Sequence, residues 1–222
     1  MTQLVIDADY LQHRFLWNRT MDEAVEDAKQ HLNDIQAELW ADDILLVLAG
    51  KNNFRKEIYP EYKAHRPSLD EDKKKLFKEF RGLITQDYPH EYAEGQEADD
   101  TCAIRTLEHP DAVLVSCDKD LLQVPCKVFN PTKWELTEVT EDMADYALHV
   151  QIIEGDRTDG ILGIPGYGPV KSKKALGDKP LGRRASRVKA VYRSQGLSKD
   201  YLQLQTDLIY IRRTEGDRYV LS

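Results

Sequence analysis

Residues 95–120 read GQEADDTCAIRTLEHPDAVLVSCDKD, and this stretch decides the fold class of the 222-residue chain. It combines a helical segment, Ala98–Leu107, with a continuous apolar run, Ala112–Ser116, a few residues later. An apolar run of strand length without polar alternation is typical of a parallel sheet that is covered on both faces. Acidic residues open the helix and follow the strand. The stretch therefore predicts a buried strand beside a helix, with carboxylates at the strand's end.

The same pattern extends in both directions along the chain. Leu4–Ile6 and Ile44–Leu48 are further apolar runs, Lys127–Asn130 is a shorter one, and Met21–Trp40 has the periodicity of a long helix. Strands that alternate with helices favour an α/β architecture. We therefore predict a mainly parallel central sheet flanked by helices.

Two regions depart from this alternation. Residues 51–95 are polar and charge-dense, and the helix expected over Leu69–Asp87 has only a thin apolar stripe, as at the rim of a domain. From Thr140 onward the pattern is helical, interrupted by the Gly/Pro-rich segment Gly155–Gly168. We expect an α/β core over residues 1–139 and a helical region over residues 140–222.

Composition excludes several classes of protein. With 41% hydrophobic and 32% charged residues the chain is neither disordered nor fibrous. Its longest apolar run, Ile44–Ala49, is far shorter than the roughly 18–20 residues of a membrane span. The first ten residues lack the basic start of a secretory signal. Three cysteines without paired spacing predict reduced thiols and a cytoplasmic location, and no disulfide framework or zinc site: Cys102, Cys117 and Cys126.

Charge is distributed unevenly along the chain, whose net charge is −8. Residues 157–222 carry 14 Lys and Arg against 6 Asp and Glu, whereas residues 1–156 carry 17 against 33. This difference can be a coincidental variation in surface charge. Alternatively, the chain has two functional parts, an acidic part that holds cations and a basic part that holds a polyanion.

Four groups of acids stand where an α/β sheet presents its functional side chains. They follow the first strand, open the helix at residue 98, follow the strand that ends at residue 116, and lie in the turn GDRTDG: Asp7; Glu97, Asp99 and Asp100; Asp118 and Asp120; Asp156 and Asp159. The carboxyl ends of parallel strands meet at one edge of a sheet. Any one of these acids alone is more often a helix cap or a helix N-terminal charge.

Convergence of these acids would favour bound cations. Two carboxylates about 4 Å apart repel each other by roughly 1–4 kcal/mol, so a larger group needs protons or metal ions. Oxygen ligands without nearby His or Cys suit Mg²⁺ or Mn²⁺. Two such ions can activate water and stabilise the leaving oxygen in phosphodiester cleavage.

The segment Gly155–Lys171, GDRTDGILGIPGYGPVK, predicts a phosphate-binding loop. Closely spaced glycines let backbone N–H groups approach a phosphate, and the helix that follows directs its positive end there. Lys171, Lys173 and Lys174 add charge on that helix. A plain loop between two helices is the alternative, and it would not need these lysines.

Five motifs, in this order, resemble those of the structure-specific 5′-nucleases, which include bacterial and phage 5′→3′ exonucleases, flap endonucleases and the nuclease domain of DNA polymerase I. They are VIDADY (5–10), NNFRKEIYPEYKAHRP (52–67), EGQEADD (94–100), SCDKDLLQ (116–123) and GDRTDGILGIPGYGPVKSKKAL (155–176). The resemblance implies a PIN-like 5′-nuclease fold, with a helical arch over about residues 51–95 and a helix–three-turn–helix motif over about residues 155–176. It implies Mg²⁺-dependent hydrolysis of DNA by a two-metal-ion mechanism, as a 5′-3′ exonuclease or flap endonuclease.

The resemblance also implies roles for the acids. The first metal site would take Asp7, Glu97, Asp99 and Asp100. Asp118 and Asp120 would lie between the two sites, and Asp156 and Asp159 would complete the second.

For the substrate, the resemblance implies that Lys63 is the active-site lysine and that Arg55 and Arg66 contact phosphates. Tyr62 would stack on a terminal base. The duplex backbone would be held by Gly166, Gly168, Lys171, Lys173 and Lys174, with a K⁺ ion bound by loop carbonyls. The expected partner of this monomer is duplex DNA with a 5′ end or 5′ flap, with an RNA–DNA hybrid as a further substrate class and no membrane.

One departure from the family's pattern keeps alternatives open. The acid usual after the second strand is absent from Leu48-Ala49-Gly50-Lys51, so the first site is one carboxylate poorer. A structure-specific DNA-binding protein with weakened catalysis would fit this loss. Asp7-Ala8-Asp9 also imitates the DxD motif of aspartyl-phosphate phosphatases, although that reading leaves the Gly/Pro motif and the basic region unexplained.

Overall fold

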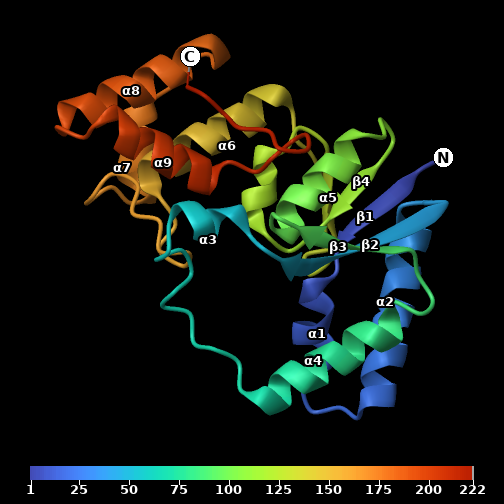
Figure 1. The fold of residues 1–222 in the computed structure, drawn as a ribbon. Helices are drawn as coiled ribbons and strands as arrows, with labels where there is room; N and C mark the ends of the chain where they lie inside the picture. The colour runs from blue at the N-terminus through green and yellow to red at the C-terminus, as the bar shows by residue number, and fades with distance from the viewer. Residues whose placement is uncertain (222) are drawn as a thin grey trace. The chain divides into compact units, whose positions relative to one another are not determined.

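A computed structural model describes residues 1–221, which form two compact units (Figure 1). Unit 1 comprises residues 1–52, 67–119 and 126–138. Unit 2 comprises residues 53–66, 120–125 and, of the described chain, 139–221. Residues 53–66 and 120–125 thus pack with the C-terminal region.

Unit 1 is built on one six-stranded sheet. The strand order is β3 (His90–Glu94), β2 (Asp43–Lys51), β1 (Gln3–Asp7), β4 (Val113–Val115), β5 (Lys127–Asn130), β6 (Glu135–Glu138). All neighbours are parallel except β5 and β6, which are antiparallel. The predicted mainly parallel sheet is confirmed. Strands β3 and β6 were not predicted, because both lie at sheet edges and have mostly exposed, polar residues.

Helices cover both faces of this sheet (Figure 1). One face carries α5 (Ala98–Leu107), and the other carries α1 (Asp9–Phe15), α2 (Met21–Glu38) and α4 (Glu71–Ile84). Helix α2 begins where Thr20 and Glu23 form a reciprocal capping box, which satisfies the first free N–H groups of the helix. The flanking helices predicted from the sequence are confirmed.

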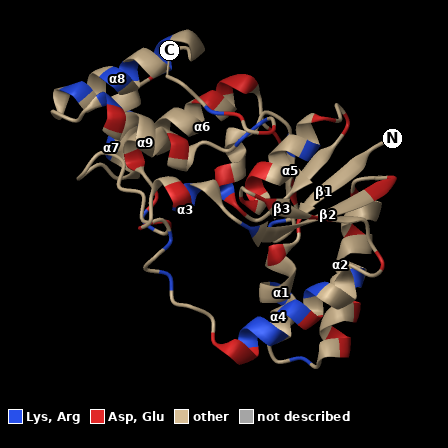
Figure 2. Cartoon of the chain, viewed as in Figure 1, with Lys and Arg blue, Asp and Glu red and all other residues tan. Residues whose placement is uncertain are grey.

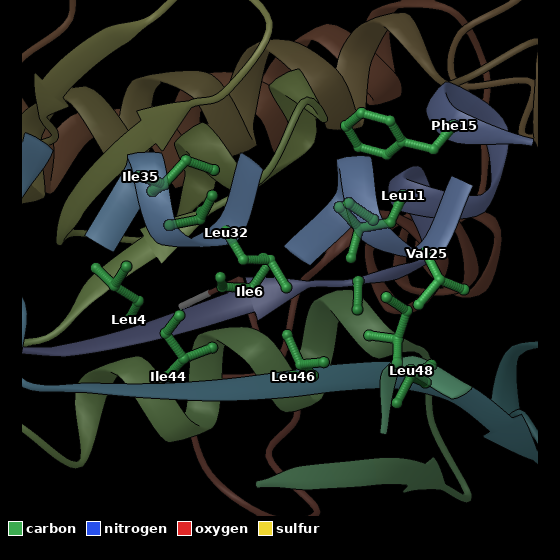
Figure 3. Close-up of a cluster of buried hydrophobic side chains, with 14 of the residues drawn as sticks. Leu4, Ile6, Leu11, Phe15, Val25, Leu32, Ile35, Ile44, Leu46 and Leu48 are labelled. Carbon is green, nitrogen blue, oxygen red and sulfur yellow. The ribbon is translucent and has the colours of Figure 1, made fainter. Parts of the chain in front are cut away.

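The core of unit 1 explains why its strands are apolar throughout (Figure 3). Leu4 and Ile6 of β1 face Leu32 and Ile35 of α2, while Val5 between them is buried on the opposite face. Each such side chain contributes about 1.5–3 kcal/mol when it is removed from water. Burial on both faces fixes the register, so the carboxyl end of each strand has a defined position.

Unit 2 is helical. It comprises α3 (Phe54–Ile58), the 3₁₀ helix η1 (Lys119–Gln123, from residue 120), α6 (Glu141–Glu154), α7 (Pro169–Leu176), the 3₁₀ helix η2 (Leu181–Arg183), α8 (Arg184–Ser194) and α9 (Lys199–Ile209). Helix α6 lies at its centre and contacts α7, α8 and α9.

A close backbone crossing shapes the loop between α6 and α7. Gly155 ends α6 with φ +76°, and a side chain there would meet the Ile161 carbonyl oxygen at 2.4 Å. Only glycine fits this position.

No helix within residues 1–221 has both the length and the apolar character that crossing a bilayer requires.

Candidate active site

Three predicted acids interact in unit 1: Asp7 at the end of β1, Asp99 in the first turn of α5, and Asp118 after β4. Burial is the main cause that raises the pKa of Asp7 to about 7, and the charges of Asp9 and Asp118 add to it. Burial also raises the pKa of Asp99 well above its usual value, followed by the charges of Asp7 and Asp118. The two desolvated carboxylates of Asp7 and Asp99 therefore interact with each other and with the exposed Asp118.

Ser116 positions two of these acids. Its hydroxyl donates a hydrogen bond to Asp7 Oδ2 at 3.0 Å and accepts one from the backbone N–H of Asp118, also at 3.0 Å. The side chain is buried. Ser116 was not among the predicted site residues, although it is a polar residue at the end of an otherwise apolar strand.

The remaining acids of the α5 cluster have a structural use. Asp100 is fully buried, and its Oδ2 accepts a hydrogen bond at 3.0 Å from the backbone N–H of Glu97. This bond is half of the reciprocal capping box that Glu97 and Asp100 form at the start of α5. Glu97 is half-buried at the start of α5.

The chemistry of the cluster fits a hard divalent cation, since every donor is a carboxylate oxygen. Within residues 1–221, however, no three acidic, His or Cys side chains are arranged closely enough to hold a metal ion. Mutual repulsion of charged carboxylates opposes such an arrangement until a cation compensates it.

The raised pKa of Asp7 predicts how stability depends on pH in the absence of divalent ions. Between about pH 4 and 7 the folded state binds the proton that the unfolded state has released, so stability falls as pH rises. We expect Asp7→Asn, measured by thermal unfolding with a chelator at pH 8, to raise the free energy of unfolding by about 1–3 kcal/mol. Near pH 4 the variant and the wild type should be alike. An identical gain at both pH values would contradict the assignment.

In unit 2, Asp159 is the centre of a charged cluster. Its carboxylate pairs with Arg66, lies 3.4 Å from Lys63 Nζ, and accepts a hydrogen bond from the Tyr62 hydroxyl at 3.0 Å. The backbone N–H of Lys63, which has φ +57°, donates to the Asp159 carbonyl at 2.9 Å. The structure thus brings together four predicted residues, from residues 53–66 and from the Gly-rich loop.

Two further acids of the predicted metal sites also lie in unit 2, and one of them, Asp156, accepts a hydrogen bond at its carbonyl from the Asp159 N–H at 3.2 Å. Asp156 Oδ1 accepts a hydrogen bond from the backbone N–H of Thr158 at 2.7 Å, as in an Asx turn. Asp120 is half-buried in η1.

Burial changes the role expected of Tyr62. Its side chain is 2% exposed within the core of unit 2, so the ring has no open face on which a base could stack. Its hydroxyl positions Asp159 instead.

Burial also changes the role expected of Arg55, which is 3% exposed and therefore does not present its guanidinium to phosphates. Its Nε and Nη2 donate to the carbonyls of Leu208 and Tyr210 at 3.0 and 2.6 Å. Arg55 thus attaches α3 to the end of α9, about 150 residues later in the chain.

We expect Arg55→Ala to destabilise the protein by about 2–4 kcal/mol, because two buried carbonyls lose a charged donor. Urea unfolding measures this difference. Lys56→Ala, at an exposed neighbouring position, is the control and should change stability by less than about 0.5 kcal/mol. Equal effects of the two changes would show that the Arg55 contacts contribute little.

The predicted phosphate-binding loop is held by α9. The Tyr201 hydroxyl donates to the Gly163 carbonyl at 2.8 Å, and the Gly163 N–H donates to Gln205 Oε1 at 2.7 Å. Side chains added at Gly166 or Gly168 would meet nothing within 4 Å, so the backbone there is open to a ligand.

Basic side chains follow this loop. Lys171 Nζ lies 3.8 Å from the Tyr167 ring centroid, and Lys173 and Lys174 are exposed on the same helix, α7. A shallow groove is lined by residues of α7 and α8 that include Lys171, Lys174 and Arg187. Figure 2 shows further basic positions along α8.

Comparison with known proteins places the chain in a family. Residues 3–149 match the family described as 5′-3′ exonuclease, N-terminal resolvase-like domain. The exodeoxyribonuclease of Enterobacteria phage T3 is 32% identical over 171 residues, covering 69% of this chain and 55% of that protein. DNA polymerase I of Rhizobium leguminosarum is 30% identical over 186 residues, covering 70% of this chain and 18% of that protein. The chain thus spans about half the length of the phage relative and a fifth of the polymerase.

Solved structures share the fold. T5 5′-exonuclease with divalent zinc ions bound superimposes with a TM-score of 0.72 at 19% identity, covering 94% of this chain and 89% of that chain. The catalytic core of Rad2 in complex with DNA substrate superimposes with a TM-score of 0.56 at 16% identity, covering 90% of this chain and 65% of that chain. With two thirds of its length matched by the family and the α/β fold in agreement, this chain belongs to the 5′-3′ exonuclease family, of which it has the N-terminal resolvase-like domain.

Proposed function

We propose that this protein is a Mg²⁺-dependent 5′-3′ exonuclease and flap endonuclease that hydrolyses phosphodiester bonds in DNA. The observation that carries the proposal is the group of interacting carboxylates Asp7, Asp99 and Asp118, at the ends of β1 and β4 and the start of α5. Its desolvated, mutually repelling charges are what a cation would stabilise. The family match and the metal ions in the T5 5′-exonuclease structure support this reading.

We assign the acids to two ions, Mg²⁺ or Mn²⁺. The carboxylates of unit 1 would hold the first, with Glu97 and Asp100 acting around them. In unit 2, Asp120, Asp156 and Asp159 would be ligands of the second. When bound, such ions activate water and stabilise the leaving oxygen.

The basic side chains Lys63 and Arg66 of unit 2 would stabilise negative charge on the substrate's phosphates. Lys63 is held by the backbone at Asp159, and its side chain, about one-fifth exposed, is positioned to stabilise negative charge developing on a phosphate. Arg66 has a more exposed side chain and would contact a neighbouring phosphate. Both must exchange Asp159 for substrate oxygens, which a metal ion on Asp159 would promote.

We propose that the loop and α7 form a helix–three-turn–helix motif that binds the duplex backbone. The open backbone at Gly166 and Gly168 and the lysines on α7 would contact phosphates, and loop carbonyls would hold K⁺. The substrates we propose are duplexes with a 5′ end or 5′ flap, RNA–DNA hybrids included. We also propose that the protein is a monomer that acts in the cytoplasm, where cysteines stay reduced.

Replacing Lys171 and Lys173 with Ala should weaken binding to every duplex sequence alike. Each neutralised phosphate contributes about −0.9 to the slope of log K against log salt, so the double variant should flatten that slope by about one to two units. Fluorescence anisotropy with Ca²⁺ in place of Mg²⁺ measures binding. Lys199→Ala, at another exposed lysine of unit 2, is the control. An unchanged slope, or a preference among sequences, would exclude this interface.

The proposed activity is tested with a labelled 5′-flap DNA and a simple phosphate ester, each with and without Mg²⁺. The proposal predicts Mg²⁺-dependent cleavage of the flap and no turnover of the ester. Turnover of the ester alone would support the phosphatase reading of Asp7-Ala8-Asp9.

A DNA-binding protein with weakened catalysis is the second candidate. The observation that favours it is Gly50, where a side chain would meet the Ala93 carbonyl oxygen at 1.8 Å, so that β2 has no room for an acid at this position. Tight, Ca²⁺-supported flap binding without Mg²⁺-dependent cleavage would support it.

A further inference from the structure

Asp9 brings a carboxylate to the strand end that lacks one. It begins α1, and its Oδ2 accepts a hydrogen bond at 3.0 Å from the backbone N–H of Ala49. Ala49 lies near the carboxyl end of β2, in the tetrapeptide Leu48-Ala49-Gly50-Lys51 without an acid. The acid that β2 lacks is therefore replaced at this strand end by the carboxylate of Asp9 from α1.

Asp9 is also close to the carboxylates of the proposed metal site. Its backbone N–H bonds to the Asp7 carboxylate, and its charge is among the causes that raise the pKa of Asp7. The hydrogen bond from Ala8 N–H to the Val47 carbonyl, at 2.8 Å, fixes the chain at this point. Asp9 thus stands at the junction of β1, β2 and α1.

One oxygen of Asp9 is buried and paired with an arginine. Arg81 of α4 places Nη2 2.9 Å from Asp9 Oδ1, but Oδ1 is buried and accepts no hydrogen bond within residues 1–221. The Arg81 Nε–H donates instead to Gln12 Oε1 at 2.9 Å. A buried carboxylate oxygen that is paired only electrostatically is a suitable donor for a hard cation.

We propose that Asp9 is a further ligand carboxylate of the metal site that contains Asp7, in place of the acid that β2 lacks. This rests on the proposed function. Arg81 is then the counter-ion of Asp9 while no metal is bound, and it competes with the incoming cation for the same carboxylate.

The alternative role for Asp9 is a tether that joins α1 to α4 through Arg81. The two roles predict different changes in metal affinity when Asp9 or Arg81 is replaced. If Asp9 is a ligand, removing its carboxylate weakens metal binding and removing the competing Arg81 charge strengthens it. If Asp9 is a tether, loss of either partner has the same effect on the metal.

The test is titration of the full chain with Mn²⁺ alone, with free Mn²⁺ followed by electron paramagnetic resonance. We expect Asp9→Asn to bind about tenfold more weakly, the order of loss seen for groups that tune a metal site. Arg81→Gln should bind about threefold more tightly, or better. Asp9→Asn with Ala49→Asp, which returns an acid to the exposed position 49, should recover most of the affinity.

Glu91→Gln is the matched control. Glu91 lies in the same unit, pairs with Arg105 at 2.7 Å, and is exposed to a similar degree. The Glu91→Gln variant should bind Mn²⁺ with wild-type affinity.

The inference would be overturned if Asp9→Asn bound Mn²⁺ with wild-type affinity. It would also be overturned if Arg81→Gln bound Mn²⁺ no more tightly than the wild type. If Asp9→Asn does not fold, the Arg81→Gln result decides. A wild type that cleaves flap DNA while Asp9→Asn binds Mn²⁺ normally rejects only this role. A wild type that neither binds Mn²⁺ nor cleaves rejects the proposed function itself.

Discussion

Asp118→Asn should abolish cleavage of flap DNA and leave DNA binding intact. We expect a loss of at least about 10³-fold in the single-turnover rate, since changing even a group that only supports a metal ligand costs about 10–100-fold. Asp118 is exposed after β4, where its backbone N–H is fixed by Ser116 and its charge acts on Asp7 and Asp99. The side chain can therefore change without disturbing the core.

Binding and folding provide the controls for this variant. Loss of the Asp118 charge relieves repulsion in the metal-free protein, so thermal stability should be unchanged or higher. Affinity for flap DNA in Ca²⁺ should be within a few-fold of wild type. Asp111→Asn, at an exposed acid before the same strand, should cleave normally. Cleavage by Asp118→Asn at the wild-type rate would remove Asp118 from the metal site.

Lys63→Ala should reduce the cleavage rate far more than the affinity for DNA. Losing one positioned donor that stabilises transition-state charge typically costs about 10²–10³ in turnover. The structure positions Lys63 firmly: its left-handed backbone is bonded to the Asp159 carbonyl, and its ammonium lies 4.9 Å from the Tyr62 ring centroid. An ordinary surface lysine has no such support.

The comparison that checks this prediction uses Lys56→Ala, an exposed lysine on α3. Single-turnover cleavage with Mg²⁺ and equilibrium binding with Ca²⁺ are measured for both variants. A loss confined to binding, or a Lys63→Ala rate within a few-fold of the Lys56→Ala rate, would show that Lys63 serves only to pair with Asp159.

The strands that could be predicted from the sequence are those that are buried on both faces of the sheet. Strands β1, β2 and β4 are covered on both faces, so their apolar runs stand out locally. Strand β3 escaped prediction because it is an edge strand in which only Ala93 is buried. Its sequence, HEYAE, has the composition of a loop.

The candidate site divides in the same way. Acids at strand ends were recognisable because position along the chain defines them. Arg55 and Tyr62 were assigned to the substrate because their motif is local, whereas their burial depends on residues about 100–150 positions away, at Leu208 and Asp159. The contact between Asp9 and Ala49 likewise arises only when β1 and β2 pair.

The central claim is that this chain degrades DNA from its 5′ end with the help of divalent ions. The most direct measurement follows one duplex, labelled at the 5′ end in one sample and at the 3′ end in another, in Mg²⁺ and in chelator. We predict short 5′-labelled products and gradually shortened 3′-labelled strands in Mg²⁺, and intact DNA in chelator. Short 3′-labelled products formed first, or equal cleavage in chelator, would contradict the account.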